Sequence, residues 1–193
     1  MPAYNFKIDL LHSEPLVTRT FRVSSESSLY LLHQIIQVVM GWRNSHLYEF
    51  SIDTLRFMDT RLVDEDFEDV TDVKSVMVED VFPRVGAKAH YLYDFGDGWM
   101  HQLELMNINH LPQNELLPSF ISAQNSCPPE DCGGIHRYLE MIEIVKDPTH
   151  AEYANIIEFL GPKFNPANLN RIAIFKALGN LRPFIKDYEQ RLR

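Results

Sequence analysis

The sequence predicts an α+β fold in which a mainly antiparallel sheet carries helices packed on one face. Strand-period alternation dominates the first half of the chain, whereas apolar residues recur at helical spacing in the last third. Strands and helices therefore do not alternate as they do in a parallel α/β fold. A chain of 193 residues with 45% hydrophobic residues can bury one complete core, so we expect a single domain over residues 1–193.

The first two predicted strands form a hairpin that leads into a helix. Residues 4–11 alternate between apolar and polar, which is typical of a half-buried strand. The turn signal at residues 13–15 precedes a second alternating stretch at 17–23. The serines of residues 24–28 then offer N-caps for a helix over 29–40, and the glycine that follows is a suitable C-terminal cap.

Strand period returns in the middle of the chain. Residues 46–52 read as a strand and residues 78–85 as one short helix. Residues 89–94 and 99–106 then form two strands that are joined by the turn Phe95-Gly96-Asp97-Gly98. We expect both glycines of this turn to adopt positive φ.

Two segments are predicted as loops, and three segments in the last third of the chain are predicted as helices. The acidic run at 64–72 is expected to be solvated, with a cation site as the alternative, although it lacks the spacing of a calcium loop. Residues 107–126 have little periodicity and two prolines, which predicts a long surface loop. Apolar stripes indicate helices over 135–145, 153–160 and 169–178.

Charge and composition exclude several classes of protein. The net charge of −9 argues against salt-driven binding to duplex nucleic acid. No run of 18 apolar residues exists, and the N-terminus lacks the basic start and apolar core of a signal peptide. We therefore expect a cytoplasmic protein without membrane contact. A local basic patch in the last third stays open as an alternative, formed by Arg171, Lys176, Arg182, Lys186, Arg191 and Arg193.

Residues that could carry chemistry concentrate in three segments. They cover residues 32–50, residues 91–101 with Tyr-Leu-Tyr-Asp-Phe-Gly-Asp-Gly-Trp-Met-His, and residues 127–134 with Cys-Pro-Pro-Glu-Asp-Cys-Gly-Gly. We expect these segments to meet in space, as a polar cleft or as a rigid structural knot, and a cleft would be the default binding site. The candidate cleft residues are His46, Tyr93, Asp94, Asp97, Trp99, His101, Glu130 and Asp131.

Several of these residues also have a structural interpretation. Asp94 and Asp97 can stabilise the turn by accepting hydrogen bonds from nearby backbone N–H groups. His101 shares an apolar strand face with Trp99, so it can be a hydrogen-bonded core residue. The string Asp94-Phe95-Gly96 imitates the magnesium motif of kinases, but the other kinase motifs are absent from the sequence.

The two cysteines are too few for a disulfide scaffold. We take Cys127, Cys132 and His101 as candidate metal ligands. Zinc would need two ligands besides the thiolates, and four histidines could supply them: His46, His101, His136 and His150. The alternatives are buried apolar cysteines, a loop that caps the following helix, and redox or nucleophilic thiols.

The motifs resemble those of a known family. The Tyr-Asp-Phe-Gly-Asp-x-Trp-x-His string at 93–101 and the cysteine string at 127–134 are similar to the plasmid pRiA4b ORF-3-like family. The segments at 147–150 and 164–166 add to a resemblance that spans roughly residues 10–178. It implies an association with mobile elements and no particular activity, because the family has none established.

Two functions of different class follow from the sequence, and it leaves open whether the chain is an enzyme. The favoured prediction is a non-catalytic binding or interaction module with a protein partner. The alternative is a metal-dependent hydrolase or nuclease, in which a metal-bound hydroxide attacks and a carboxylate acts as the base. This alternative requires several side chains to converge within about 5 Å of one point, from among His46, Asp94, Asp97, His101, Cys127 and Cys132.

Overall fold

One sheet of eight strands organises the computed structural model, which describes residues 2–64, 67, 69–110 and 116–192. The strands are β1 (Pro2–Leu10), β2 (Thr18–Ser24), β3 (Tyr48–Ile52), β4 (Leu55–Met58), β5 (Val70–Asp72), β6 (Lys88–Tyr93), β7 (Trp99–His110) and β8 (Ser119–Gln124). Their order in the sheet is β5-β4-β3-β6-β7-β1-β2-β8, and all neighbours are antiparallel except β4 and β5. The predicted α+β fold with a mainly antiparallel sheet is confirmed.

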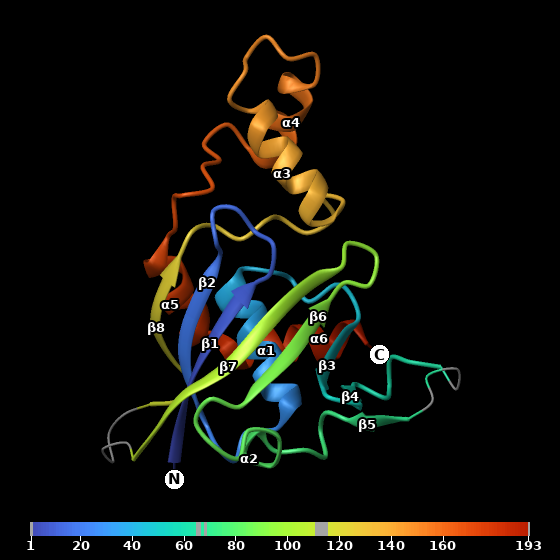
Figure 1. The fold of residues 1–193 in the computed structure, drawn as a ribbon, viewed down its shortest axis with the longest axis vertical. Coiled ribbons are helices and arrows are strands. Elements are labelled where there is room, and N and C mark those ends of the chain that lie inside the picture. The colour runs from blue at the N-terminus through green and yellow to red at the C-terminus, as the bar shows by residue number, and fades with distance from the viewer. Residues whose placement is uncertain (1, 65–66, 68, 111–115, 193) are drawn as a thin grey trace.

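The helices divide into a group on the sheet and a hairpin beyond it. They are α1 (Leu29–Met40), α2 (Val78–Val81), α3 (Gly134–Ile144), α4 (Tyr153–Leu160), α5 (Arg171–Gly179) and α6 (Leu181–Arg191). Helix α1 contacts α5 and α6 on one face of the sheet. Helices α3 and α4 contact each other and project past one end of the sheet (Figure 1). Among the described residues, no helix is both long and apolar enough to cross a bilayer.

Alternation along β1 shows how the sheet builds the core. Tyr4, Phe6, Ile8 and Leu10 are buried, whereas the residues between them lie half-buried on the opposite face. The ring of Phe6 packs edge-on against Phe82, with centroids 4.7 Å apart. This is the pattern expected of a strand with one face against helices and the other toward solvent.

Helix α1 begins and ends where the sequence predicts. The side chain of Ser28 accepts a hydrogen bond from the N–H of Leu31, and Gly41 ends the helix with φ +92°. The helix is unusual in burying three polar side chains completely: His33, Gln34 and Gln37.

The predicted loop over 107–126 is wrong in two places. Strand β7 continues to His110 along β1, and residues 119–124 form the edge strand β8. Only Ala123 of β8 is buried, so the strand carries no alternation that a sequence pattern could detect. Residues 111–115 of the predicted loop lie outside the described residues.

The acidic run and the short helix also differ from the prediction. The run at 64–72 ends in β5, which pairs with β4 at the sheet edge, and residues 65, 66 and 68 lie outside the described part. The helix predicted over 78–85 ends at Val81. Pro83 explains this early end, because the residue before a proline is disfavoured in helical conformation.

Candidate functional site

Three segments distant in the sequence meet beside the end of β6. They are the loop 42–47 between α1 and β3, the turn 94–98 between β6 and β7, and the loop 127–133 that leads into α3. The indole Nε1 of Trp42 donates to the carbonyl of Pro128 at 3.0 Å. Three loops that are far apart in the chain thus form one structural unit.

Glu130 connects the loop 127–133 by hydrogen bonds to the loop 42–47 and to the end of β6. Its carboxylate accepts hydrogen bonds from the hydroxyl of Tyr93 and, at 2.9 Å, from the N–H of Arg43. The Tyr93 oxygen in turn accepts from the N–H of Ser45 at 3.0 Å. Burial and the contact with Glu130 raise the pKa of Tyr93, so its hydroxyl remains a protonated donor at neutral pH.

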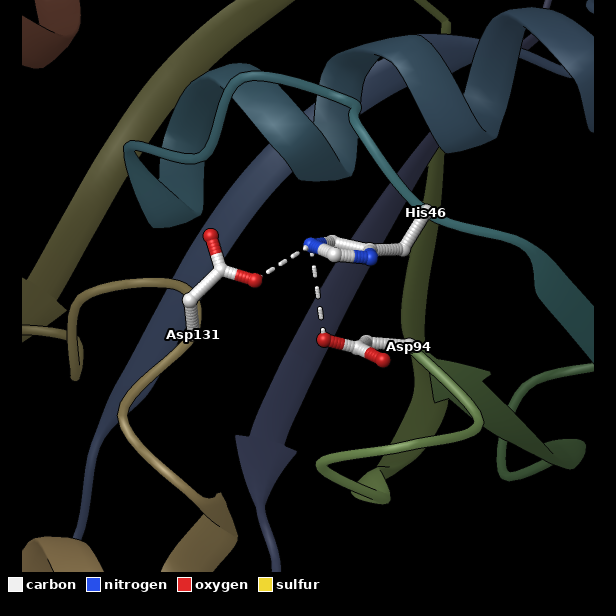
Figure 2. A group of neighbouring side chains, drawn as sticks. All are labelled: His46, Asp94 and Asp131. Carbon is white, nitrogen blue, oxygen red and sulfur yellow. Dashed lines mark ion pairs between the residues drawn. The ribbon is translucent and has the colours of Figure 1, made fainter.

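His46 lies between two carboxylates (Figure 2). Its Nε2 is 3.2 Å from Oδ1 of Asp131 and 3.5 Å from Oδ2 of Asp94. Neither contact has hydrogen-bond geometry, so this buried nitrogen has no hydrogen-bond partner among the described residues. Each side chain offers one atom to a group whose members all lie within 4.8 Å of one another, and the described ranges hold no other such group of three or more His, Cys, Asp or Glu ligands.

The turn 94–98 fixes the position of Asp94. Asp94 adopts φ +58°, a left-handed conformation that aspartate tolerates. Its Oδ1 accepts from the N–H groups of Gly96 at 2.9 Å and Asp97 at 3.2 Å, as predicted, which leaves Oδ2 to face His46. Asp97, for which the same role was predicted, instead accepts at Oδ2 from the N–H of Gly133 at 3.3 Å, outside the turn. Gly98 has the expected positive φ, but Gly96 does not, because Asp94 itself supplies the left-handed residue.

The cluster of His46, Asp94 and Asp131 is open on one side. The side chain of Asp94 is 8% exposed and that of His46 27%, whereas that of Asp131 is 72% exposed. A cation held by these three groups would have protein on the inner side and solvent on the outer side. Such an arrangement leaves coordination positions for water or for a ligand.

A buried hydrogen-bond network holds the loop that carries His46. The Nδ1 of His33 lies 2.9 Å from the Tyr91 hydroxyl, and its Nε2 lies 2.8 Å from Oδ1 of Asn44. Gln37 donates to the same Tyr91 hydroxyl and accepts from the N–H of Asn44, both at 3.0 Å. Every donor in this network meets an acceptor if Nε2 of His33 carries the proton and donates to Asn44, while the Tyr91 hydroxyl donates to Nδ1. Burial lowers the pKa of His33 to about 3, so the ring is neutral.

His101 and Trp99 belong to the core, which confirms the structural interpretation of His101. Both side chains are fully buried. The Nδ1 of His101 donates to the carbonyl of Tyr91 at 3.1 Å, and its ring lies edge-on to Trp42. Burial lowers the pKa of His101 to about 4, so this ring is also neutral at neutral pH.

The cysteines stay outside the cluster. In the described part of the chain, Cys127, Cys132 and His101 do not form a ligand group as tight as that around His46, and His136 and His150 join none. Both cysteines are free. Burial raises the pKa of both thiols, that of Cys132 to about 12. Protonated thiols are poor nucleophiles, so the structure gives no support to a reactive cysteine.

The basic residues predicted as a local patch are spread over α5 and α6. Arg171 donates to the carbonyl of Ala123 at 3.0 Å, and Arg191 to that of Arg43 at 2.8 Å. These two side chains therefore contact backbone oxygens of neighbouring elements. Arg193 lies outside the described residues.

A cavity of about 460 Å³ adjoins His46. It lies between the loop residues 44–47, Leu62 and the last turns of α6, where Tyr188, Arg191 and Leu192 line it. The sequence did not point to Tyr188 as part of a site, and it pointed to Arg191 only as a member of the local basic patch. Both occupy ordinary positions of a helix, and only the packing of α6 against the loop brings them beside His46.

Comparison with known proteins places the chain among relatives of similar length. Residues 2–173 match the family described as "Plasmid pRiA4b ORF-3-like protein". "Uncharacterized protein y4hQ" of Sinorhizobium fredii (strain NBRC 101917 / NGR234) is 37% identical over 178 residues, which cover 91% of this chain and 90% of the relative. The crystal structure of "Protein of Unknown Function MM3350 from Methanosarcina mazei Go1" has a TM-score of 0.79 at 28% identity and covers 88% of this chain and 95% of that chain.

Proposed function

The chain belongs to the plasmid pRiA4b ORF-3-like family, as its motifs predict, and we propose that His46, Asp94 and Asp131 bind a divalent transition-metal ion that serves hydrolytic chemistry. The observation that carries this proposal is the buried Nε2 of His46, which faces two carboxylate oxygens without a hydrogen bond to either. An ion between the three groups would satisfy the nitrogen and relieve the repulsion between the carboxylates.

The spacing of the ligand atoms around His46 fits a bound metal ion. A first-row metal with nitrogen and oxygen ligands at about 2.0–2.2 Å keeps adjacent ligand atoms roughly 3.0–3.5 Å apart. The Nε2 of His46 lies 3.2 Å and 3.5 Å from the two carboxylate oxygens, within this range. Two of the three separations between ligand atoms therefore already suit a metal, and the third, between the two carboxylates, is within 4.8 Å.

The donor set indicates which ions fit and what they can do. One imidazole and two carboxylates suit manganese, iron or zinc, and the absence of a thiolate from the cluster disfavours copper(I). Three protein ligands with an exposed side are typical of catalytic rather than structural metal sites. A metal-bound water at such a site loses a proton near neutral pH and becomes a nucleophile.

Elemental analysis of protein purified without chelator, followed by titration with Mn²⁺ and Zn²⁺, tests metal binding. We expect about one ion per chain, lost in His46→Gln and in Asp94→Asn. His90→Gln is the matched control, because His90 is exposed on β6 and outside the cluster. Failure of the wild-type protein to take up either ion, or uptake that is unchanged in both cluster variants, would refute the site.

Cleavage of a model ester tests the proposed hydrolytic chemistry separately from metal binding. Metal-loaded protein should cleave a phosphodiester such as bis(p-nitrophenyl) phosphate, and cleavage should fall at least tenfold in Asp131→Asn and in chelator. If the protein binds metal but cleaves no ester, the metal site stands and the hydrolytic role is refuted.

A second candidate function, the interaction module favoured by the sequence, rests on a different surface. A hollow of about 660 Å³ lies between α5, α6 and the residues that precede β8. Phe175 and Leu116 line it and are 69% and 85% exposed. Exposed apolar side chains around a hollow are typical of protein-binding surfaces. Comparison of the proteins captured by the wild-type chain and by Phe175→Asp tests this function, which fails if both capture the same set.

A further inference from the structure

The cavity beside His46 has features of a small-molecule site that the metal cluster does not use. Its volume of about 460 Å³ falls within the range of ligand pockets in proteins, roughly 300–1,000 Å³. Its walls combine the polar loop 44–46 with three leucines, Leu47, Leu62 and Leu192. A ligand there would meet both an apolar surface and polar groups.

Tyr188 contributes a donor that the protein leaves unused. The residue is 3% exposed and lines the cavity. Its hydroxyl is buried and, like those of Tyr48 and Tyr138, has no hydrogen-bond partner among the described residues. A buried hydroxyl without a partner costs free energy, and an acceptor on a ligand would remove that cost.

Arg191 places a positive charge in the wall of the cavity. Its Nη2 donates to the carbonyl of Arg43 at 2.8 Å, and its Nε lies 3.3 Å from Asp187, so the guanidinium is anchored on one edge. A guanidinium has five N–H donors, so others remain available to a ligand. No carboxylate is among the described residues that line the cavity, and Arg191 is the only one of them with a permanent charge.

We infer that this cavity binds a small organic anion. Its phosphate or carboxylate group pairs with Arg191 and accepts a hydrogen bond from the Tyr188 hydroxyl, while its apolar body contacts Leu62 and Leu192. Guanidinium groups match both anions in geometry, so the two ligand classes share this chemistry. The inference goes beyond the proposed metal site, from which it is independent except for the shared neighbour His46.

Calorimetric titration of the full chain tests the inference with three probes: phenyl phosphate, benzoate and uncharged benzyl alcohol. We expect saturable 1:1 binding of at least one of the two anions, and at least tenfold weaker binding of the alcohol. The stronger of the two anions identifies the ligand class. No saturable binding of either anion, or equal binding of the alcohol, would overturn the inference.

Variants of α6 assign the binding to this cavity. Arg191→Gln should weaken anion binding at least tenfold, and Tyr188→Phe, which removes only the hydroxyl, about fivefold. Lys186→Gln is the matched control, because it makes the same change in charge at an exposed position of α6 that does not line the cavity. Binding that is insensitive to both cavity variants would overturn the assignment.

A titration in chelator separates this inference from the metal proposal. Anion binding should persist in chelator and in Asp131→Asn, since Asp131 does not line the cavity and the proposed anion partners, Arg191 and Tyr188, are not part of the metal cluster. If it disappears under both conditions, the metal holds the anion, and the cavity assignment is wrong while the metal site stands. If the protein takes up no metal but still binds the anion, the metal site is wrong and the cavity assignment stands.

Discussion

His33 and His101 are fully buried rings whose neutrality matters for the stability of the protein. His33 orients Asn44, two residues before His46, and His101 packs beneath Trp42 at the start of the same loop. Each ring donates to an oxygen, and neither has a carboxylate as hydrogen-bond partner among the described residues. A proton added to either ring would place an uncompensated charge in the core.

This arrangement makes stability depend on pH in the range where histidine titrates. The pKa is about 3 for His33 and about 4 for His101 in the folded protein, against an ordinary 6.5. Below pH 6.5 the unfolded chain binds protons that the folded chain cannot, so the free energy of unfolding falls as pH falls. Each ring contributes about 1.4 kcal/mol per pH unit once its unfolded form is protonated.

Urea denaturation between pH 7.5 and 5 measures this effect above the range of the carboxylates. We expect a decline that becomes shallower in His33→Gln, whereas His90→Gln, an exposed histidine, should leave the slope unchanged. A wild-type stability that is constant over this range would contradict the neutral, buried state of both rings.

The sequence predicts that the three segments of the cluster meet in space, but it does not single out His46, Asp94 and Asp131 as the side chains that converge. Turn chemistry at Asp94 and the cysteine string around Asp131 mark both as candidates, and both lie where a loop meets a regular element. The sequence also offered His101, Cys127 and Cys132 as candidate ligands, beside a structural interpretation of each. Strand alternation puts His101 on the same face of β7 as Trp99, and the structure buries that face in the core, away from the cluster.

At the level of elements, the contact between the turn 94–98 and the start of α3 requires a glycine. Gly134 adopts φ +77°, and a Cβ there would lie 2.4 Å from the carbonyl oxygen of Asp97. Gly86 has a similar φ of +84° with no atom within 4 Å of its ideal Cβ. An alanine at Gly86 would have only the strain of a left-handed backbone, whereas an alanine at Gly134 would have this strain and a steric clash. Comparison of the two substitutions therefore gives the free energy of the clash.

Paired substitutions measure that clash. Gly86→Ala should lower the free energy of unfolding by about 1–2 kcal/mol through backbone strain alone. Gly134→Ala should cost clearly more, and it should also weaken metal binding because it displaces the loop that carries Asp131. Equal losses of stability in the two variants, measured by urea denaturation, would mean that α3 moves away from the turn without cost.

Elements with a regular apolar pattern were predictable even at the periphery, as α4 shows with one buried residue, Ile156, whereas β8 and α6 were not predicted. The alternation of β1 and the capping residues of α1 mark these elements in the sequence because both face the core. Edge strand β8 buries only Ala123 and so shows no alternation, and helix α6 buries only Leu181 and Tyr188. Pro183 further obscures α6, although proline is tolerated in the first turn of a helix.

At the scale of the whole molecule, the α3–α4 hairpin is an appendage of the sheet. It projects beyond the sheet in Figure 1 and is joined to it through the loop 127–133 and through residues 161–170. The cluster bridges these two parts, because Asp131 belongs to the loop that enters α3, whereas His46 and Asp94 are fixed by the sheet. Metal binding and the attachment of the hairpin are therefore coupled.

Hydrogen exchange tests this coupling. Amides of α3 and α4 should exchange faster than those of β1 and β7, because the hairpin can open without unfolding the sheet. A metal that binds only the closed arrangement stabilises it by mass action, so Mn²⁺ or Zn²⁺ should slow exchange over residues 130–145 and leave β7 nearly unchanged. Asp131→Asn should abolish this protection. If the hairpin and the sheet exchange as one unit with or without metal, the appendage is rigid, and the cluster does not control its attachment.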